Sequence, residues 1–178
     1  MSFARARAFI VFGVLAVAAV VFMIVALVRD SQADVVAGAG CPASAPRANI
    51  KLPAGPEQIT VKVLNGTRTP GLAQRVTNDF KNRQFKVQKP AEDKKRVKDV
   101  AVLRFGPEAV GAAQLLRAYF LNQADLEYNA RRKGAAVDIV LGTNFQQLAT
   151  STEVKQSLSI IGEPELPPGA CVAPAQKA

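Results

Sequence analysis

The sequence predicts an α+β fold, in which a two-layer domain has helices on one face of a mixed sheet, plus one N-terminal transmembrane helix. Short segments alternate apolar and polar residues, as half-buried strands do. Between them lie segments whose apolar residues recur every three to four positions, the period of an amphipathic helix. Strands and helices mixed in this order favour a sheet covered by helices on one face. A further apolar segment, which is concentrated at the start of the chain and uncharged, predicts the transmembrane helix.

The transmembrane helix is predicted over residues 8–28, which carry no charged side chain. At about 1.5 Å rise per residue this stretch spans roughly 31 Å, the thickness of the hydrocarbon core of a bilayer. Arg5 and Arg7 precede the stretch. The positive-inside rule therefore places residues 1–7 in the cytoplasm and everything after Val28 outside the cell membrane.

A cleaved signal peptide and a lipid anchor are weaker hypotheses for the apolar segment. Ser31-Gln32-Ala33 offers the small residues of a signal-peptide cleavage site. The apolar run, however, exceeds the usual hydrophobic region of about 7–15 residues. A lipid-modified Cys41 is disfavoured because Gly38 stands where an aliphatic residue is expected. The prediction is a retained anchor, which makes the chain a single-pass membrane protein.

The composition excludes most catalytic chemistry. The chain has 178 residues, no histidine and two cysteines. It therefore lacks the material for a His or Cys metal cluster, a Ser-His-Asp triad or a Cys-His pair, and no cofactor is predicted. Lys and Arg number 23 against 14 Asp and Glu, which gives a net charge of +9. Without histidine this charge does not change near neutral pH, so we expect anionic partners.

The folded unit is predicted over residues 58–162. Residues 29–57 are rich in Ala, Pro and Gly without any period, which is typical of an extracytoplasmic linker, and the tail at 163–178 is similar. Cys41 and Cys171 flank the unit, and outside the cytoplasm an even pair of cysteines favours a disulfide. That bridge would tie the tail back to the domain and hold the domain close to the membrane.

The predicted domain begins with a strand, a helix and a strand. Ile59–Leu64 alternates apolar and polar residues, and Asn65-Gly66 ends it in a turn. Thr69 is the predicted helix N-cap, and Pro70 suits the first turn. The apolar stripe of this helix consists of Leu72, Val76 and Phe80. A second strand is predicted at Phe85–Val87.

The later elements continue this mixture. A strand at Asp99–Phe105 leads into a helix that Gly106-Pro107 opens. The face of that helix consists of Ala109, Ala112, Ala113, Leu116, Tyr119 and Phe120. Leu126–Tyr128 and Ala136–Leu141 are predicted strands. Thr143-Asn144-Phe145-Gln146 has the form of a capping box, which predicts that the last helix begins there.

These elements resemble the LytR C-terminal domain. The likeness covers roughly residues 58–150, and this family's domain occurs appended to LytR-CpsA-Psr glycopolymer ligases or alone on small anchored proteins of actinobacteria. The chain is most similar to the solitary form, especially the actinobacterial envelope integrity proteins, and has no room for the ligases' catalytic domain. The resemblance implies envelope maintenance through contacts with wall polymer or wall-building proteins, and it supplies no ligand residues. The segments that carry it are Val61-Lys62-Val63-Leu64-Asn65-Gly66-Thr67, Gly71-Leu72-Ala73 with Val76 and Phe80, and Val140-Leu141-Gly142-Thr143-Asn144-Phe145.

The turn after the first strand is a candidate anion or ligand loop. It joins a strand to a helix N-terminus, where unpaired N–H groups and the helix dipole favour a phosphate or a uronate. A turn that merely caps the helix accounts for the same residues, and the Gly-Lys-Ser/Thr ending of a P-loop is missing. The candidate residues are Asn65, Gly66, Thr67, Arg68, Thr69 and Gly71.

Two basic clusters form a candidate basic patch, and each is expected on a loop. They would attract lipid headgroups or anionic, phosphorylated wall polymers, although a solvated loop is the simpler interpretation. Nucleic acid is excluded as a partner because the topology keeps the domain out of the cytoplasm. The clusters comprise Lys94, Lys95, Arg96 and Lys98, and Arg131, Arg132 and Lys133.

The sequence favours binding over catalysis. A sugar-binding aromatic platform is poorly supported, because tryptophan is absent and Tyr119 and Tyr128 are the only tyrosines. A wall hydrolase would need catalytic carboxylates, and the candidates are Asp125, Glu127 or Asp138. These residues are most simply explained as surface charges. The prediction is a non-enzymatic binding or scaffolding protein of the cell envelope. The alternatives are a cell-wall hydrolase and an accessory subunit of a glycopolymer ligase or transporter.

Overall fold

The computed structural model describes residues 13, 15–21, 41–42 and 44–173, and the chain divides into two units, Met1–Gly40 and Cys41–Ala178. Residues 13 and 15–21 are helical. The rest of the predicted transmembrane helix, the predicted cytoplasmic stretch and the Ser31-Gln32-Ala33 site lie outside the described residues. Over the described residues, the structure contains no helix with the length and apolarity needed to span a membrane.

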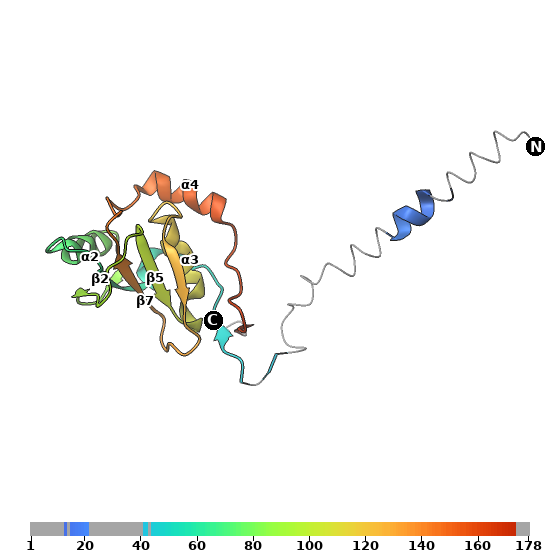
Figure 1. The fold of residues 1–178 in the computed structure, drawn as a ribbon, viewed down its shortest axis with the longest axis horizontal. Helices are drawn as coiled ribbons and strands as arrows, with labels where there is room; N and C mark the ends of the chain where they lie inside the picture. Colours follow the sequence, from blue (N-terminus) through green and yellow to red (C-terminus); the bar gives the residue numbers. More distant parts are fainter. Residues whose placement is uncertain (1–12, 14, 22–40, 43, 174–178) are drawn as a thin grey trace, which may run out of the picture. The chain divides into compact units, whose positions relative to one another are not determined.

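A six-stranded mixed sheet organises the second unit (Figure 1). Strands β2 and β7 are parallel, β5 runs antiparallel to β7, and β6 lies parallel to β5 at one edge. The order across the sheet is β3 (Lys86–Val87), β2 (Thr60–Asn65), β7 (Ala136–Leu141), β5 (Ala101–Phe105) and β6 (Asp125–Tyr128), with β4 (Ala91–Glu92) pairing β2 beside β3. The mixed sheet confirms the predicted α+β class.

One face of the sheet carries the main core because every second strand residue points to it. Val63, Leu103 and Ile139 are fully buried there, together with residues of α2 (Leu72–Asn82) and α3 (Val110–Ala118). Phe80 of α2 packs edge-on against Phe85, with ring centroids 5.0 Å apart. Both helices therefore cover the same face, as predicted.

The opposite face has only a small apolar cluster. Leu64, Val97 and Val140 are buried together there, with Val102 packed against them. Val97 comes from the connection between β4 and β5, and its N–H donates to Gly66 O at 3.0 Å. The rest of this face is polar, and we call it the open face.

The structure extends the folded unit beyond the predicted boundary at residue 58. β1 (Arg47–Ala48) pairs in parallel with β8 (Cys171–Val172), and Ala48 is fully buried. Asn49 N donates to Pro107 O at 2.8 Å, and Gly111 N donates to Asn49 O at 3.0 Å. The lack of a period at residues 41–57 predicts a linker. An extended segment whose backbone is hydrogen-bonded, however, needs no period.

Gly111 makes this docking possible, because a Cβ at this position would overlap the carbonyl oxygen of Lys51. We expect Gly111→Ala to push residues 47–51 off α3 and to destabilise the domain by about 1–3 kcal/mol, as overpacking does. Trypsin should then cleave after Lys51 faster than in the wild type. Gly13→Ala is the control for an added methyl group, since no atom of the described residues lies within 4 Å of that Cβ. Unchanged cleavage in Gly111→Ala would contradict the docking.

Two helices begin later than predicted. α2 starts after Gly71, which is its N-cap at φ 70° and makes no side-chain cap bond, so Thr69 is not the cap. α4 (Ser151–Ile161) starts after Thr150, and the capping box is Thr150 with Glu153 rather than residues 143–146. Thr143 N instead donates to Val97 O at 3.0 Å, and this holds the 143–146 segment in a turn.

The remaining short elements complete the unit. α4 packs on α3 through Ala118, Ala149 and Val154 rather than on the sheet. Two 3-10 turns, η2 (Pro56–Gln58) and η3 (Pro107–Ala109), begin at prolines and precede β2 and α3. In the tail, Ala170 is buried in the main core, and Leu166 packs against it. The tail is thus part of the fold as far as residue 173.

Candidate functional site

The open face presents a row of alternating charges across four strands. The register places Lys62 of β2 beside Asp138 of β7, Asp138 beside Arg104 of β5, and Arg104 beside Glu127 of β6. Adjacent strands lie about 4.7–4.9 Å apart, so side chains at neighbouring register positions on one face are close and opposite charges stabilise the sheet. The row exists because each of these residues occupies an outward position in its strand.

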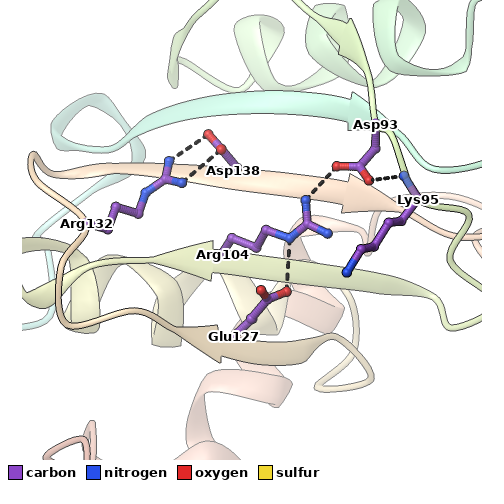
Figure 2. A network of polar contacts seen from close by, with 6 residues as sticks. All are labelled: Asp93, Lys95, Arg104, Glu127, Arg132 and Asp138. Atoms are coloured by element: carbon purple, nitrogen blue, oxygen red, sulfur yellow. Dashed lines mark hydrogen bonds and ion pairs between the residues drawn. The ribbon is translucent and has the colours of Figure 1, made fainter.

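Arg104 is the centre of this row (Figure 2). Its Nη1 lies 2.5 Å from Asp93 Oδ2, and its Nε lies 2.9 Å from Glu127 Oε2. Arg132 binds Asp138 with both terminal nitrogens, Nη1 to Oδ2 at 2.9 Å and Nη2 to Oδ1 at 2.8 Å. Two-point contacts of this kind fix the geometry of a guanidinium as well as its charge. The arginines of the network are therefore used within the protein.

Asp93 ties the connection between β4 and β5 to the sheet. Its side chain is only 7% exposed, and the Lys95 N–H donates to Oδ1 at 2.8 Å. Burial disfavours the charged carboxylate, but the Lys95 N–H and the Arg104 guanidinium outweigh burial and lower the pKa of Asp93. For Arg104, burial acts against the charge, and the hydrogen bonds that it donates to Glu127 and Asp93 outweigh burial and raise the pKa.

A pH dependence follows from the lowered pKa of Asp93. A depressed folded-state pKa stabilises the fold above the unfolded-state value of about 3.9, and this contribution is lost as pH falls through the folded-state pKa. We expect Asp93→Asn to lower the free energy of unfolding at pH 7, and its difference from the wild type to shrink below about pH 4. Urea titrations at pH 7 and pH 3 measure this.

Asp125→Asn is the matched control, since Asp125 is exposed on the neighbouring strand β6. It should change stability by no more than about 0.5 kcal/mol at either pH. A difference between Asp93→Asn and the wild type that is the same at both pH values would show that the Asp93 charge does not hold the connection.

The predicted basic clusters lie at opposite ends of this network, as Arg132 and Lys95 show in Figure 2. Two of their seven members are occupied, because Arg132 binds Asp138 and Arg96 Nη1 donates to Thr67 O. The others remain exposed and available to an anion: Lys94, Lys95, Lys98, Arg131 and Lys133. The fold thus separates the two clusters rather than joining them in one patch.

The candidate loop at residues 65–71 satisfies most of its own hydrogen bonds. Asn65 Oδ1 accepts from Thr67 N at 3.0 Å and from Thr67 Oγ1 at 2.8 Å. Thr67 Oγ1 accepts from Thr69 N at 3.0 Å, and Gly66 N donates to Leu141 O at 2.9 Å. Asn65 Nδ2 also donates to the carboxylate of Glu92, at 3.1 Å. These contacts make the loop a rigid turn, with Arg68 exposed beside it.

The two cysteines form the predicted disulfide, Cys41–Cys171. Beside it, Cys171 N donates to Pro46 O at 2.9 Å and Ala173 N donates to Ala48 O at 2.8 Å. The bridge and the β1–β8 pairing therefore hold both ends of the unit together.

The sequence identifies Glu127 and Asp138 as acids and Arg132 as part of the basic patch, but it predicts neither Arg104 nor the pairing of these residues. Arg104 and Asp138 each stand at an outward position in an apolar strand, a signal that marks an exposed sheet face. Glu127 is bonded to Arg104 and Asp138 to Arg132, so both carboxylates have arginine partners within the domain. Tyr119 and Tyr128 pack against Phe85 and Phe105 in the core.

The fold defines a small α+β domain with a mixed sheet, helices on one face and a disulfide joining its ends. Residues 58–145 match the family described as LytR cell envelope-related transcriptional attenuator. This part of the chain belongs to that family, the LytR C-terminal domain family. No curated protein matches the chain.

A solved structure supports the assignment. The chain is similar to the soluble domain of a conserved hypothetical secreted protein, an Rv2700 ortholog, from Mycobacterium marinum. The two are 25% identical with a TM-score of 0.51, over 68% of this chain and 82% of that one. The similarity extends over more of the chain than the family match does.

Proposed function

We propose that the chain is a single-pass membrane protein whose outer domain is a binding or scaffolding component of the cell envelope. The observation that carries this is the Cys41–Cys171 disulfide, because structural disulfides persist in oxidising compartments and are rare in the cytoplasm. The uncharged residues 8–28 behind Arg5 and Arg7 supply the anchor. The family's description as cell envelope-related and the secreted relative support the same location.

The basic residues that the open face leaves unpaired support an anionic wall polymer as the partner. Lys94, Lys98, Arg131 and Lys133 are exposed. Without Arg5, Arg7 and Arg29, the chain has 20 basic against 14 acidic residues, and this net charge of +6 attracts phosphorylated or uronate-bearing polymers. Exposed lysines and arginines give mainly electrostatic attraction, which salt screens. Such contacts suit a protein that holds components in place and performs no chemistry on them.

A topology reporter tests the location. Alkaline phosphatase fused after Ala178 should be active in intact cells, and green fluorescent protein at the same position should not fluoresce. The opposite pattern would place the domain in the cytoplasm and overturn the proposal.

In-cell crosslinking tests the role. A photo-crosslinker at position 98 or 133 should capture wall polymer or wall-assembly proteins. The matched control is position 160 on α4, which is exposed and belongs to neither basic cluster. Exchanging residues 8–28 for a foreign transmembrane helix should leave capture and envelope integrity intact. Loss of both would favour the accessory-subunit alternative, in which the helix itself contacts a ligase or transporter. Turnover of glycan by the purified chain would favour the hydrolase.

A further inference from the structure

A groove of about 490 Å³ lies between α2 and the irregular segment at residues 145–147. Its volume falls in the range of about 300–1,000 Å³ that small-molecule sites occupy. It is lined by Leu72 and Val76 at the edge of the core-facing stripe of α2, by exposed polar residues of the same helix, and by the segment that connects β7 to α4. Neither the basic clusters nor the open-face network contributes a residue to it.

The polar side chains of this groove are unused by the protein. In the described part of the chain, the side chains of Arg75, Asp79, Gln146 and Gln147 take part in no hydrogen bond or ion pair, although Arg75 and Asp79 are four residues apart on one helix. Asn78 Oδ1 accepts from Gln74, which leaves the Asn78 amide N–H groups to donate. The arginines of the open face, by contrast, are held by carboxylates.

An aromatic ring completes the lining. Phe145 is half-buried, with one side against Phe120 at a centroid distance of 6.0 Å, and it also lines the groove with Leu72 and Val76. The hydrogen bond from Phe145 N to Gly142 O, at 3.1 Å, fixes the turn that carries the ring. The groove thus combines a fixed apolar surface with amide, carboxylate and guanidinium groups.

We propose that this groove binds a neutral sugar unit of an envelope glycan. A pyranose ring has an apolar face of C–H groups, which can pack on Phe145, and hydroxyls that both donate and accept hydrogen bonds. Asp79 accepts from hydroxyls, Arg75 donates to them, and the amides of Gln146 and Gln147 do both. The charges of Arg75 and Asp79 cancel, so the groove favours a neutral sugar over the anionic polymers that the basic residues attract. The inference rests on the proposed function for bringing the domain to glycans.

Calorimetric titration of the full chain, in a detergent without a sugar headgroup, tests the groove. The probes are maltotetraose, xylotetraose and chitotetraose, with tetragalacturonate as the charged counterpart and tetraalanine as the peptide. We expect at least one neutral tetrasaccharide to bind more tightly than either counterpart. Asp79→Ala, and separately the Gln146→Ala/Gln147→Ala pair, should weaken its binding at least tenfold. Lys81→Gln is the matched control, because Lys81 is exposed on the same helix but outside the groove.

Several results would overturn the inference. They are no binding of any neutral probe, binding that the groove variants do not change, and preference for tetragalacturonate or tetraalanine. An unchanged unfolding midpoint in each variant separates lost contacts from lost folding. The proposed function has a separate readout: capture of wall polymer through positions 98 and 133 that persists in Asp79→Ala would keep the scaffold and remove the groove.

Discussion

Replacing both Cys41 and Cys171 by serine should lower the free energy of unfolding by about 3–5 kcal/mol. The bridge closes a loop with a sequence separation of 130 residues, and in the chain-entropy model a long closed loop restricts the unfolded state strongly. Urea denaturation of the full chain followed by circular dichroism measures the loss. Amide exchange gives a second readout, since the N–H of Ala173, which donates to Ala48 O, should exchange faster without the bridge.

The control for this result is the wild-type chain after reduction. It should show the same loss of stability as the double serine variant, because both lack the cross-link. Equal stability of oxidised and reduced protein would mean that the β1–β8 pairing holds the ends without covalent help.

Phe80→Ala should cost about 3–5 kcal/mol, the range for truncating a buried phenylalanine. Phe80 is fully buried and its ring meets three others, Phe85 at 5.0 Å, Tyr119 at 6.1 Å and Phe120 at 6.4 Å. These rings join α2 to the end of α3, so a cavity there loosens both helices. The measurement is again urea denaturation.

Lys81→Ala changes the next residue, which is exposed, and should alter stability by no more than about 0.5 kcal/mol. A loss below about 1.5 kcal/mol in Phe80→Ala would indicate that neighbouring side chains collapse into the space. It would also mean that the aromatic group contributes less than its burial implies.

The strands and the faces of the helices could be predicted because burial imposes a period on the sequence. β7 and β2 alternate strictly at their first residues, and the stripe from Leu72 to Phe80 matches the buried side of α2. The beginning of α4 could not be predicted in this way. Both Thr143 and Thr150 have the sequence pattern of a helix N-cap. The hydrogen bond from Thr143 N to Val97 O, a residue distant in sequence, decides between them.

Docking of the segment before residue 58 could not be predicted for a related reason. Residues 47–49 contribute backbone hydrogen bonds and one small buried side chain, Ala48, so no apolar pattern marks them. The candidate sites were equally dependent on tertiary structure. The row from Lys62 to Glu127 appears only when the strand order is known, and the groove appears only when residues 145–147 lie beside α2. Arg96 and Arg132 are free charges in the sequence-based prediction. In the structure Arg96 donates to Thr67, which is distant in sequence, and Arg132 binds Asp138 of the following strand.

The place of the Cys41 bridge determines how the domain bears mechanical load. A pull on the chain ahead of Cys41 reaches a branch point, from which one path runs along the backbone into β1 and the other crosses sulfur to Cys171. The pulling force is thus divided between the first and last segments of the unit. Separating β1 from β8 therefore also requires the path through the Cys41–Cys171 disulfide to give way. A domain under repeated tension gains resistance to unfolding from such a bridge, and after reduction the backbone hydrogen bonds of β1 and β8 would carry the whole load.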